Sequence, residues 1–241
     1  MDSNIEPYKI AVPDSSLRRL KQKLELTDLP NEIEGSGWKY GVPLSDIKRL
    51  KRHWETKFDW RAQEWKLNEL PQFETKITVD GFEPINIHFV HQKSGLPSAI
   101  PLLFVHGWPG SFIEAMKIIP LLRGGNGKPV FDIVAPSLPN YAFSDGVSKP
   151  GFALSQYAET CHKLMLKLGY NQYVTQGGDW GFLITRTLAH LYPKHCKACH
   201  VNWIFASPPK WTESNPEPEY SAREKAALGR GQDWWAGDGR G

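Results

Sequence analysis

The first part of the chain carries apolar side chains at helical spacing. Three leucines follow Asp14 at intervals of three and four residues: Leu17, Leu20 and Leu24. This spacing places them on one face of a helix, and Asp14 can act as its N-cap. A similar stripe predicts a second helix that starts near Ser45, and a third helix is expected from Asp59 to Leu70. Residues 1–72 are therefore expected to form a helical domain.

From Phe73 onward the apolar period shortens to two. Apolar and polar side chains alternate over residues 73–79, which predicts a half-buried β-strand. The dipeptide Asp80-Gly81 then supplies a hairpin turn into a second strand over residues 85–90. The two segments together predict an antiparallel hairpin.

Beyond the hairpin, buried strands and helices alternate. Short apolar runs predict strands at residues 101–105, 131–135, 173–175 and 198–204. Helical spacing predicts helices at residues 112–122, 153–168 and 182–191. This alternation favours an α/β protein whose mostly parallel sheet is covered by helices on both faces. The antiparallel hairpin at its start is more typical of an α/β-hydrolase than of a dinucleotide-binding fold.

A change of composition after the last expected strand marks a boundary. Pro208 to Pro218 is rich in Pro, Ser and Glu, as linkers are, and Tyr220 to Leu228 can form one more helix. We therefore expect three parts: the helical domain over residues 1–72, a partial α/β-hydrolase core over residues 73–207, and a C-terminal segment over residues 208–241.

The run Gly177-Gly178-Asp179-Trp180-Gly181 lies at a strand-to-helix junction, where a nucleophile elbow belongs. Such a turn strains the backbone of its central residue and needs small neighbours, so that strand and helix can approach each other. It presents Asp179 beside a helix N-terminus, which favours negative charge. A carboxylate there needs no base to act as a nucleophile. The alternative is that Asp179 only N-caps the helix, and this run alone does not decide between the two.

A second run, His106-Gly107-Trp108-Pro109-Gly110, follows an apolar strand and precedes a helix. It matches the loop that donates one backbone N–H to an oxyanion hole, and the other donor would be the N–H of Trp180. An ordinary turn rich in Gly and Pro is the alternative. Because both runs occur in the right order, each at a strand-to-helix junction, we interpret Asp179 as a nucleophile.

Both runs and several segments of the helical domain resemble epoxide hydrolases of the microsomal type. The segments in question are Trp38 to Pro43, Asp59 to Arg61 and Asn68 to Phe73. The similarity extends over nearly the whole chain and includes the helical N-terminal domain that marks this branch of the α/β-hydrolases. It is specific, because these segments have no place in a generic hydrolase.

The resemblance implies that an epoxide is hydrolysed to a vicinal diol in two steps. The Asp179 carboxylate would attack an epoxide carbon to form an alkyl-enzyme ester, and a histidine-activated water would then cleave the ester. In the family, two lid tyrosines hydrogen-bond the epoxide oxygen. The N–H groups of Trp108 and Trp180 would stabilise the tetrahedral intermediate of ester hydrolysis, not the first attack. The implied partner is a small apolar epoxide, and no cofactor is implied.

The remaining catalytic groups are not found in the sequence. In this fold the acid and the histidine follow the nucleophile, and the chain beyond Asp179 is short. His190 and His195 lie at or beyond the far end of the helix that follows Asp179, more than about 10 Å away at a rise of about 1.5 Å per residue. We expect packing or surface roles for them and for His200, and we assign no catalytic histidine, second acid or lid tyrosine. Residues 208–241 are expected to form a linker and the start of the family's lid, which the tail from Gly229 to Gly241 resembles, so the chain is expected to stop before the rest of the machinery.

Two further signals are weaker. The run from Cys196 to His200 matches the c-type haem attachment pattern, but no export signal accompanies it and the segment is expected to enter a strand. His195 and this run could not readily enclose zinc tetrahedrally, so we expect no metal. Gly124 to Lys128 suggests a phosphate loop, but its first glycine and its final Ser or Thr are missing, and we expect a surface turn.

Composition and charge agree with a globular enzyme. The 241 residues are 40% hydrophobic, and 29 Lys and Arg against 26 Asp and Glu leave a net charge of +3. The charges are interspersed, so nucleic acid is not implied. The N-terminus lacks the apolar stretch of a signal peptide, and no run approaches a membrane span. We expect a protein that is not secreted and is cytoplasmic or peripherally associated with the endoplasmic reticulum.

Two other hypotheses stay open. Another hydrolase with an Asp nucleophile, such as a haloalkane dehalogenase, shares the Asp-Trp-Gly elbow, although the helical domain argues against it. The other hypothesis is a non-catalytic truncated fragment, motivated by the histidine and lid tyrosines that we could not assign. We expect at most a stalled ester from the 241-residue chain, and measurable turnover would exclude the fragment hypothesis.

Overall fold

The computed structural model describes residues 4–124, 128–204 and 209–236. The chain divides into two compact units. The first, which we call the sheet unit, comprises Met1–Ala11 and Arg61–Phe205, and the second comprises Val12–Trp60 and Ala206–Gly241. The glycine-rich turn expected at residues 124–128 and the end of the C-terminal segment lie largely outside the described residues.

The sheet unit is built on one mixed sheet of seven strands among the described residues. The strands are β1 (Ile5–Pro7), β2 (Gln72–Ile77), β3 (Ile85–Gln92), β4 (Ile100–Val105), β5 (Phe131–Pro136), β6 (Tyr173–Gly177) and β7 (Cys196–Val201). Their order is β1-β2-β3-β5-β4-β6-β7. The pairs β1–β2, β2–β3 and β3–β5 are antiparallel. The pairs β5–β4, β4–β6 and β6–β7 are parallel. The expected hairpin leading into a mostly parallel sheet is therefore confirmed.

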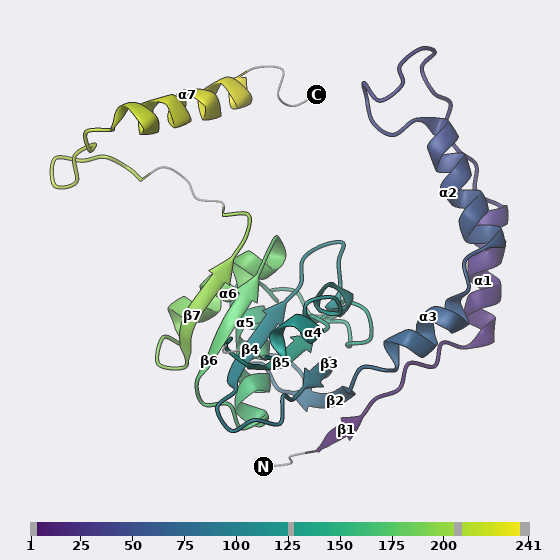
Figure 1. Ribbon diagram of the computed structural model, residues 1–241, viewed down its shortest axis with the longest axis horizontal. Helices are drawn as coiled ribbons and strands as arrows, with labels where there is room; N and C mark the ends of the chain where they lie inside the picture. The colour runs from purple at the N-terminus through teal and green to yellow at the C-terminus, as the bar shows by residue number, and fades with distance from the viewer. Residues whose placement is uncertain (1–3, 125–127, 205–208, 237–241) are drawn as a thin grey trace. The chain divides into compact units, whose positions relative to one another are not determined.

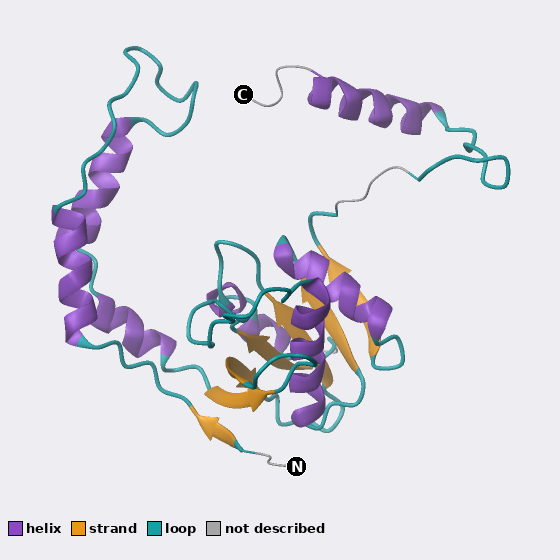
Figure 2. Cartoon of the chain, turned by 180° about the vertical axis from the view of Figure 1, so that it is seen from behind, coloured by secondary structure: helices purple, strands orange, loops and turns teal. Residues whose placement is uncertain are grey.

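The described residues form the helices α1 (Asp14–Glu25), α2 (Leu44–Thr56), α3 (Trp60–Leu67), the 3-10 helix η1 (Phe112–Ala115), α4 (Ile119–Leu122), α5 (Leu154–Lys167), α6 (Trp180–Leu191) and α7 (Ala222–Ala236). Helices of the sheet unit cover both faces of the sheet: α4 lies in front of the strands in Figure 1, whereas α5 and α6 cross the sheet in Figure 2, seen from behind. None of the described helices is long and apolar enough to cross a membrane.

The core lies between the sheet and the pair α5 and α6. Its fully buried side chains come from β3, β4 and β5 and from the two helices, and they include Ile87, Phe89, Leu103, Leu164 and Leu188. Successive strand residues alternate between faces and helical residues recur every three to four positions, so each element contributes one apolar face. A core of this kind fixes the carboxyl ends of β4 and β6, after which both glycine-rich runs begin.

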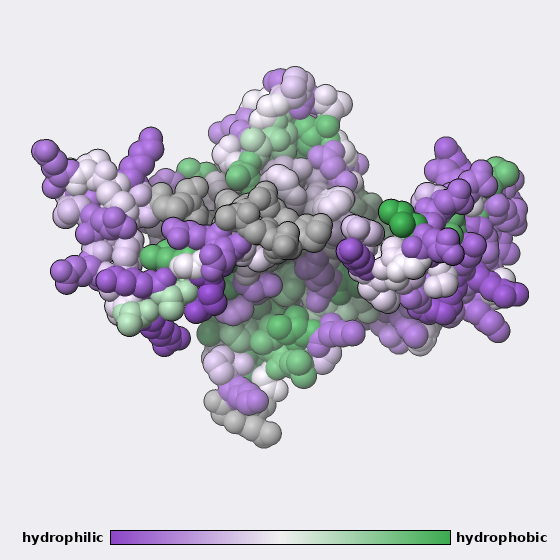
Figure 3. All heavy atoms as spheres, turned by 90° about the horizontal axis from the view of Figure 1, so that it is seen from above, coloured by the Kyte–Doolittle hydropathy of each residue, from purple (hydrophilic) through white to green (hydrophobic). Residues whose placement is uncertain are grey.

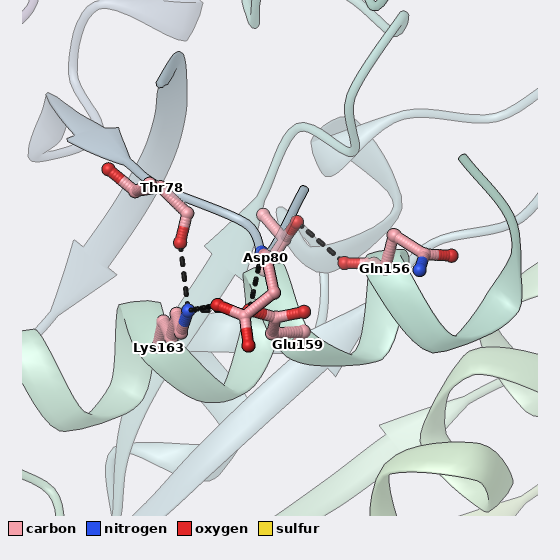
Figure 4. A network of polar contacts seen from close by, with 6 residues as sticks. Thr78, Asp80, Gln156, Glu159 and Lys163 are labelled. Carbon is pink, nitrogen blue, oxygen red and sulfur yellow. Dashed lines mark hydrogen bonds and ion pairs between the residues drawn. The ribbon is translucent and has the colours of Figure 1, made fainter. Parts of the chain in front are cut away.

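The turn between β2 and β3 is fastened to α5 by a network of polar contacts. Figure 4 shows Lys163 on α5 pointing toward the turn. Its ammonium donates hydrogen bonds to the Thr78 carbonyl at 3.0 Å and to Asp80 Oδ1 at 2.9 Å, while the Asp80 N–H donates to Glu159 Oε1 at 2.9 Å. The hydrogen bond from Lys163 and its positive charge lower the pKa of Asp80. These contacts hold the hairpin against the helix that covers it.

In the second unit, α1 and α2 contact each other. Leu17, Leu20 and Leu24 are the expected apolar stripe of α1, and they are half-buried while most of the helix is exposed. On α2, Leu50 and Trp54 are about half exposed, at 51% and 48%. Figure 3 shows that hydrophilic residues dominate the visible surface and that hydrophobic residues form smaller groups among them.

Several expected boundaries are wrong for identifiable reasons. Pro13 takes the N-cap position of α1, so Asp14 is the first helical residue. The single helix expected over residues 112–122 is split into η1 and α4, because Pro120 has no N–H to donate and its ring would clash within a continuous helix. Trp203 has a positive φ of 61°, and β7 ends at Val201 instead of continuing to residue 204.

One strand was not expected from the sequence, and two helices have other bounds than expected. β1 was not expected, since three residues are too few for a period to show. It exists because Ile5, Glu6 and Pro7 pair with β2. α3 ends at Leu67 instead of residue 70, and α7 begins at Ala222 and continues to Ala236, beyond the expected end at residue 228.

Three buried histidines predict how stability depends on pH. Burial is the main cause that lowers the pKa of His88, His91 and His162 to about 4. The unfolded chain binds these protons near pH 6.5, whereas the folded chain does not, so the free energy of unfolding falls as pH drops from about 6.5 to about 4. Urea denaturation should give a clearly lower midpoint at about pH 4.5 than at about pH 7. Equal midpoints would contradict the assignment of neutral histidines to the folded state.

Candidate active site

Asp179 occupies the turn between β6 and α6 in a strained backbone conformation. Its φ is 52° and its ψ is −126°, a region that a residue with a Cβ rarely adopts and that costs about 1–3 kcal/mol. An ordinary N-cap has extended backbone angles and accepts a hydrogen bond from the second or third residue of the helix. Asp179 instead accepts from Trp180, the first residue of α6. The geometry therefore differs from that of a simple helix cap.

Glycines surround this turn because no side chain fits. A Cβ on Gly181 would lie 2.1 Å from the Val105 carbonyl oxygen, and a Cβ on Gly177 would lie 2.2 Å from the Gly181 carbonyl oxygen. A Cβ on Gly107 would lie 2.6 Å from the Cβ of Asp179. These close approaches bring β4, β6 and α6 together under the carboxylate. Gly178 is less restricted, since its Cβ would lie 2.3 Å from a side-chain atom, the oxygen of Asn202.

Two backbone amides point at the carboxylate of Asp179. The Trp108 N–H donates to Asp179 Oδ1 at 2.7 Å, and the Trp180 N–H donates to the same oxygen at 2.6 Å. Hydrogen bonds to an ionised oxygen are short and strong, as these are. Because both amides bind Oδ1, the second oxygen, Oδ2, is the one that can form a new bond.

The loop that carries Trp108 is held by the buried imidazole of His106. The Leu138 N–H donates to His106 Nε2 at 3.1 Å, and His106 Nδ1 lies 2.9 Å from the Gly107 carbonyl oxygen. An amide N–H can only donate and a carbonyl can only accept, so Nε2 is unprotonated and Nδ1 carries the proton. Burial lowers the pKa of His106, against the opposing effect of the Gly107 hydrogen bond. The peptide bond between Trp108 and Pro109 is cis.

Two cavities adjoin Asp179 on the sheet unit. One, of about 700 Å³, is mainly apolar and aromatic and is lined by Trp108, Leu138, Tyr141, Phe152, Leu154, Tyr157, Trp180 and Leu183, among others. Burial, the neighbouring Tyr157 and the negative charge of Asp179 together raise the pKa of Tyr141. The other cavity, of about 780 Å³, is more polar and is lined by Asp179, Glu114, Gln176 and Asn202, among others. Asp179 itself lines the polar cavity, and the two residues whose amides hold its carboxylate, Trp108 and Trp180, line the apolar one.

The structure brings together the site residues expected from the sequence. Asp179, Trp108 and Trp180 meet through two hydrogen bonds. Gly107, Pro109 and Gly178 line the polar cavity beside them. Gly181 lies under the turn and His106 under the loop.

Other residues of the site had no local signal in the sequence. Leu138 contributes a backbone N–H, which no side-chain pattern encodes. Gln176 Nε2 donates to Asn202 Oδ1 at 3.3 Å, and this pair lies beside Asp179 in the polar cavity. Both residues stand at the carboxyl ends of parallel strands, where ligand sites gather in α/β proteins. That general rule is the signal that could have found them.

The histidines that we placed outside the site lie elsewhere. His195 packs edge to face against His162, with ring centroids 4.7 Å apart, and its Nδ1 is 2.7 Å from the Asn171 carbonyl oxygen. His190 and His200 are exposed. No histidine lines either of the two cavities described above. Within the described ranges, no group of three His, Cys, Asp or Glu side chains could hold a metal ion.

Comparison with known proteins agrees with this architecture. The sequence matches the family model described as "Epoxide hydrolase N terminus" over residues 5–115 and the model described as "alpha/beta hydrolase fold" over residues 100–224. Epoxide hydrolase 1 of Sus scrofa is 42% identical over 210 residues, which cover 83% of this chain and 45% of that protein.

Solved structures of similar proteins extend the comparison to the fold. The crystal structure of juvenile hormone epoxide hydrolase from the silkworm Bombyx mori has a TM-score of 0.74 at 35% identity and covers 83% of this chain and 53% of that one. The structure of Aspergillus niger epoxide hydrolase has a TM-score of 0.79 at 32% identity, and the match covers 96% of this chain and 60% of that one.

The fold and the site define an α/β-hydrolase whose elbow carries an aspartate. Within that class, the chain belongs to the epoxide hydrolase family. It spans about half the length of the curated relatives it matches, for example 45% of the Sus scrofa protein and 51% of a relative from Stigmatella aurantiaca.

The close packing under the elbow predicts the effect of adding one methyl group. Gly181→Ala places a Cβ against backbone atoms of β4 that cannot move away, so we expect a loss of about 1–3 kcal/mol in the free energy of unfolding. Gly229→Ala is the matched control, because Gly229 lies within α7 with open space around it. The control should lose nothing and can gain up to about 1 kcal/mol in helix propensity. Urea denaturation of both variants measures the difference, and equal effects would refute the steric argument.

Proposed function

We propose that this chain carries the nucleophilic half of an epoxide hydrolase, with Asp179 as the attacking group. The observation that supports it is the strained turn that holds the Asp179 carboxylate against two amide N–H groups beside an apolar cavity. A simple cap would need neither the strain nor the second amide, which comes from a loop 71 residues away in sequence.

The first step follows from the two different oxygens of the carboxylate. Oδ2 attacks an epoxide carbon, the ring C–O bond breaks, and its electron pair leaves on the epoxide oxygen as an alkoxide, which takes up a proton. The product is an ester between the Asp179 carboxyl and the substrate. The resemblance to the family assigns the stabilisation of the alkoxide to lid tyrosines, and we assign that role to no residue of this chain.

The second step uses the same two amides. In the ester, Oδ1 becomes the carbonyl oxygen, and it already accepts from the Trp108 and Trp180 N–H groups at 2.7 and 2.6 Å. When water adds to the carbonyl carbon, negative charge develops on this oxygen, and preorganised donors stabilise it. The water needs a general base, and no histidine is among the residues that line the two cavities. We therefore expect ester formation without steady turnover.

The side chains that line the apolar cavity indicate the substrate class. Trp108, Leu138, Phe152, Leu154 and Leu183 present aromatic and aliphatic side chains to the cavity beside Asp179. Apolar substrate surface is favoured there, because water is released when it is buried. We propose a small apolar epoxide as the substrate.

The subcellular location is a separate proposal. We propose that the protein is cytoplasmic or peripherally associated with the endoplasmic reticulum. Fractionation of cells that express the chain tests this, and recovery in the culture medium would refute it.

Covalent trapping tests the proposed nucleophile. Styrene oxide incubated with the purified chain should add one epoxide mass, and peptide mapping should place the adduct on Asp179. Asp179→Asn should abolish the adduct, because an amide is a far weaker nucleophile than a carboxylate. Asp80→Asn, whose carboxylate lies on the hairpin turn, serves as the control and should label like the wild type.

Three results would contradict this proposal in different ways. An adduct that survives in Asp179→Asn would show that another group attacks. Release of halide from a bromoalkane, with no labelling by the epoxide, would favour the haloalkane dehalogenase hypothesis. Repeated turnover of the epoxide by this chain would show that a base for the second step is present.

A further inference from the structure

The loop that carries the Trp108 N–H is anchored through one peptide unit of a neighbouring loop. The Leu138 N–H donates to His106 Nε2, and His106 in turn bonds the Gly107 carbonyl, one residue before Trp108. The Leu138 N–H belongs to the same planar peptide unit as the Ser137 carbonyl. Whatever fixes Ser137 therefore fixes the direction of the bond to His106.

Ser137 is fixed at three points by buried groups. Its N–H donates to the His88 carbonyl oxygen at 2.8 Å, and its hydroxyl lies 2.8 Å from His88 Nδ1. Its carbonyl accepts from Ser144 Oγ at 2.7 Å, and Ser144 Oγ accepts from the His88 N–H at 2.9 Å. His88 and Ser137 are both 0% exposed. All three anchors of Ser137 therefore lead to His88, directly or through Ser144.

The partners of His88 also determine which of its nitrogens carries the proton. Gln72 Nε2 donates to the Leu67 carbonyl at 2.8 Å, which leaves Gln72 Oε1 to face His88 Nε2 at 2.9 Å. Since this oxygen can only accept, His88 Nε2 carries the proton and Nδ1 accepts from the Ser137 hydroxyl. The ring thus has two distinct ends, one toward Gln72 and one toward Ser137.

The Gln72 end of His88 leads away from the site. Gln72 lies near Asn68, which bonds both the N–H and the carbonyl of Ile10 at 2.8 and 2.9 Å. The rings of Tyr8, Phe112 and Phe143 pack around His88 with centroids 4.8 to 5.4 Å away. This end of the ring therefore secures the N-terminal strand region, and the Ser137 end leads to the Trp108 loop.

We propose that His88 is a positioning residue: through the Ser137–Leu138 peptide unit and His106, it holds the loop whose Trp108 N–H faces Asp179. The consequence for catalysis rests on the proposed function, whereas the consequence for the loop does not. His88 touches no substrate in this account, and its side chain acts on the loop through the hydrogen bond at Nδ1. The two anchors that come from the His88 backbone stay in place whatever side chain stands at position 88.

The two ends of the imidazole can be replaced one at a time. His88→Asn places an amide oxygen near the position of Nδ1, so it can still accept from Ser137, but it loses Gln72. His88→Gln places an amide nitrogen near the position of Nε2, so it can still donate to Gln72, but it loses Ser137. Both variants lose the ring and its aromatic contacts, so both should show a similar drop in thermal stability. A purely structural role for His88 predicts that they behave alike.

Two readouts on the full chain test the proposal. The first is amide hydrogen exchange of the peptide that spans residues 104–110, which should be faster in His88→Gln than in His88→Asn. The second is the rate at which the Asp179 adduct with styrene oxide forms. This rate should fall by about tenfold or more in His88→Gln, since the Trp108 N–H holds Oδ1 and so orients Oδ2, and misplacing an attacking group slows its reaction. His88→Asn should stay within about threefold of the wild type.

A second pair of variants tests the same proposal if a His88 variant fails to fold. Ser137→Ala removes only the hydroxyl donor and should behave like His88→Gln. Gln72→Met removes the other partner of His88, together with the hydrogen bond from Gln72 to the Leu67 carbonyl, and should leave exchange over residues 104–110 unchanged. Equal exchange in the two members of each pair would overturn the proposal. If the wild type forms no Asp179 adduct at all, the proposed function fails, and the exchange measurement still decides whether His88 positions the loop.

Discussion

The site depends on a tight approach of backbones that only glycine permits. β4, β6 and α6 meet under Asp179 with no room for a side chain on Gly177, Gly181 or Gly107. That approach forces Asp179 into a positive φ of 52° and brings its carboxylate to two amide N–H groups. The strain is offset by these charge-assisted hydrogen bonds and by the core that holds the strands. The position of the carboxylate is therefore a consequence of the backbone packing directly under the turn.

The hydrogen bonds explain how one carboxylate can serve both steps of the proposed reaction. Oδ1 is held by the amides of Trp108 and Trp180, and Oδ2 remains available to an electrophilic carbon. The same amides then face the oxygen on which charge develops during ester hydrolysis. Backbone amides at the start of a helix, and in a loop held by the buried His106, cannot easily turn away, so the donors are in place before the reaction begins. The network from His88 to His106 extends this preorganisation across the sheet unit.

Much of this arrangement could be predicted from the sequence, because local patterns encode it. The change of period at Phe73, the Asp80-Gly81 turn and the two glycine-rich runs at strand-to-helix junctions were sufficient for the mixed sheet and for the meeting of Asp179 with Trp108. What was missed depends on contacts between distant segments. β1 has three residues and exists only through pairing with β2, and Leu138 acts through a backbone N–H. The histidines His88 and His106 differ in role only through their partners, which no spacing reveals.

The central claim is that the Trp108 and Trp180 amides bind the carboxylate of Asp179, and amide proton chemical shifts test it most directly. Both hydrogen bonds are short and charge-assisted, so both amide protons should resonate far downfield in the ¹H–¹⁵N spectrum of the purified chain. In Asp179→Ala, both resonances should move upfield by a large amount, while that of Gly229 on α7 should stay in place. Resonances of Trp108 and Trp180 that do not respond to the loss of the carboxylate would contradict the account.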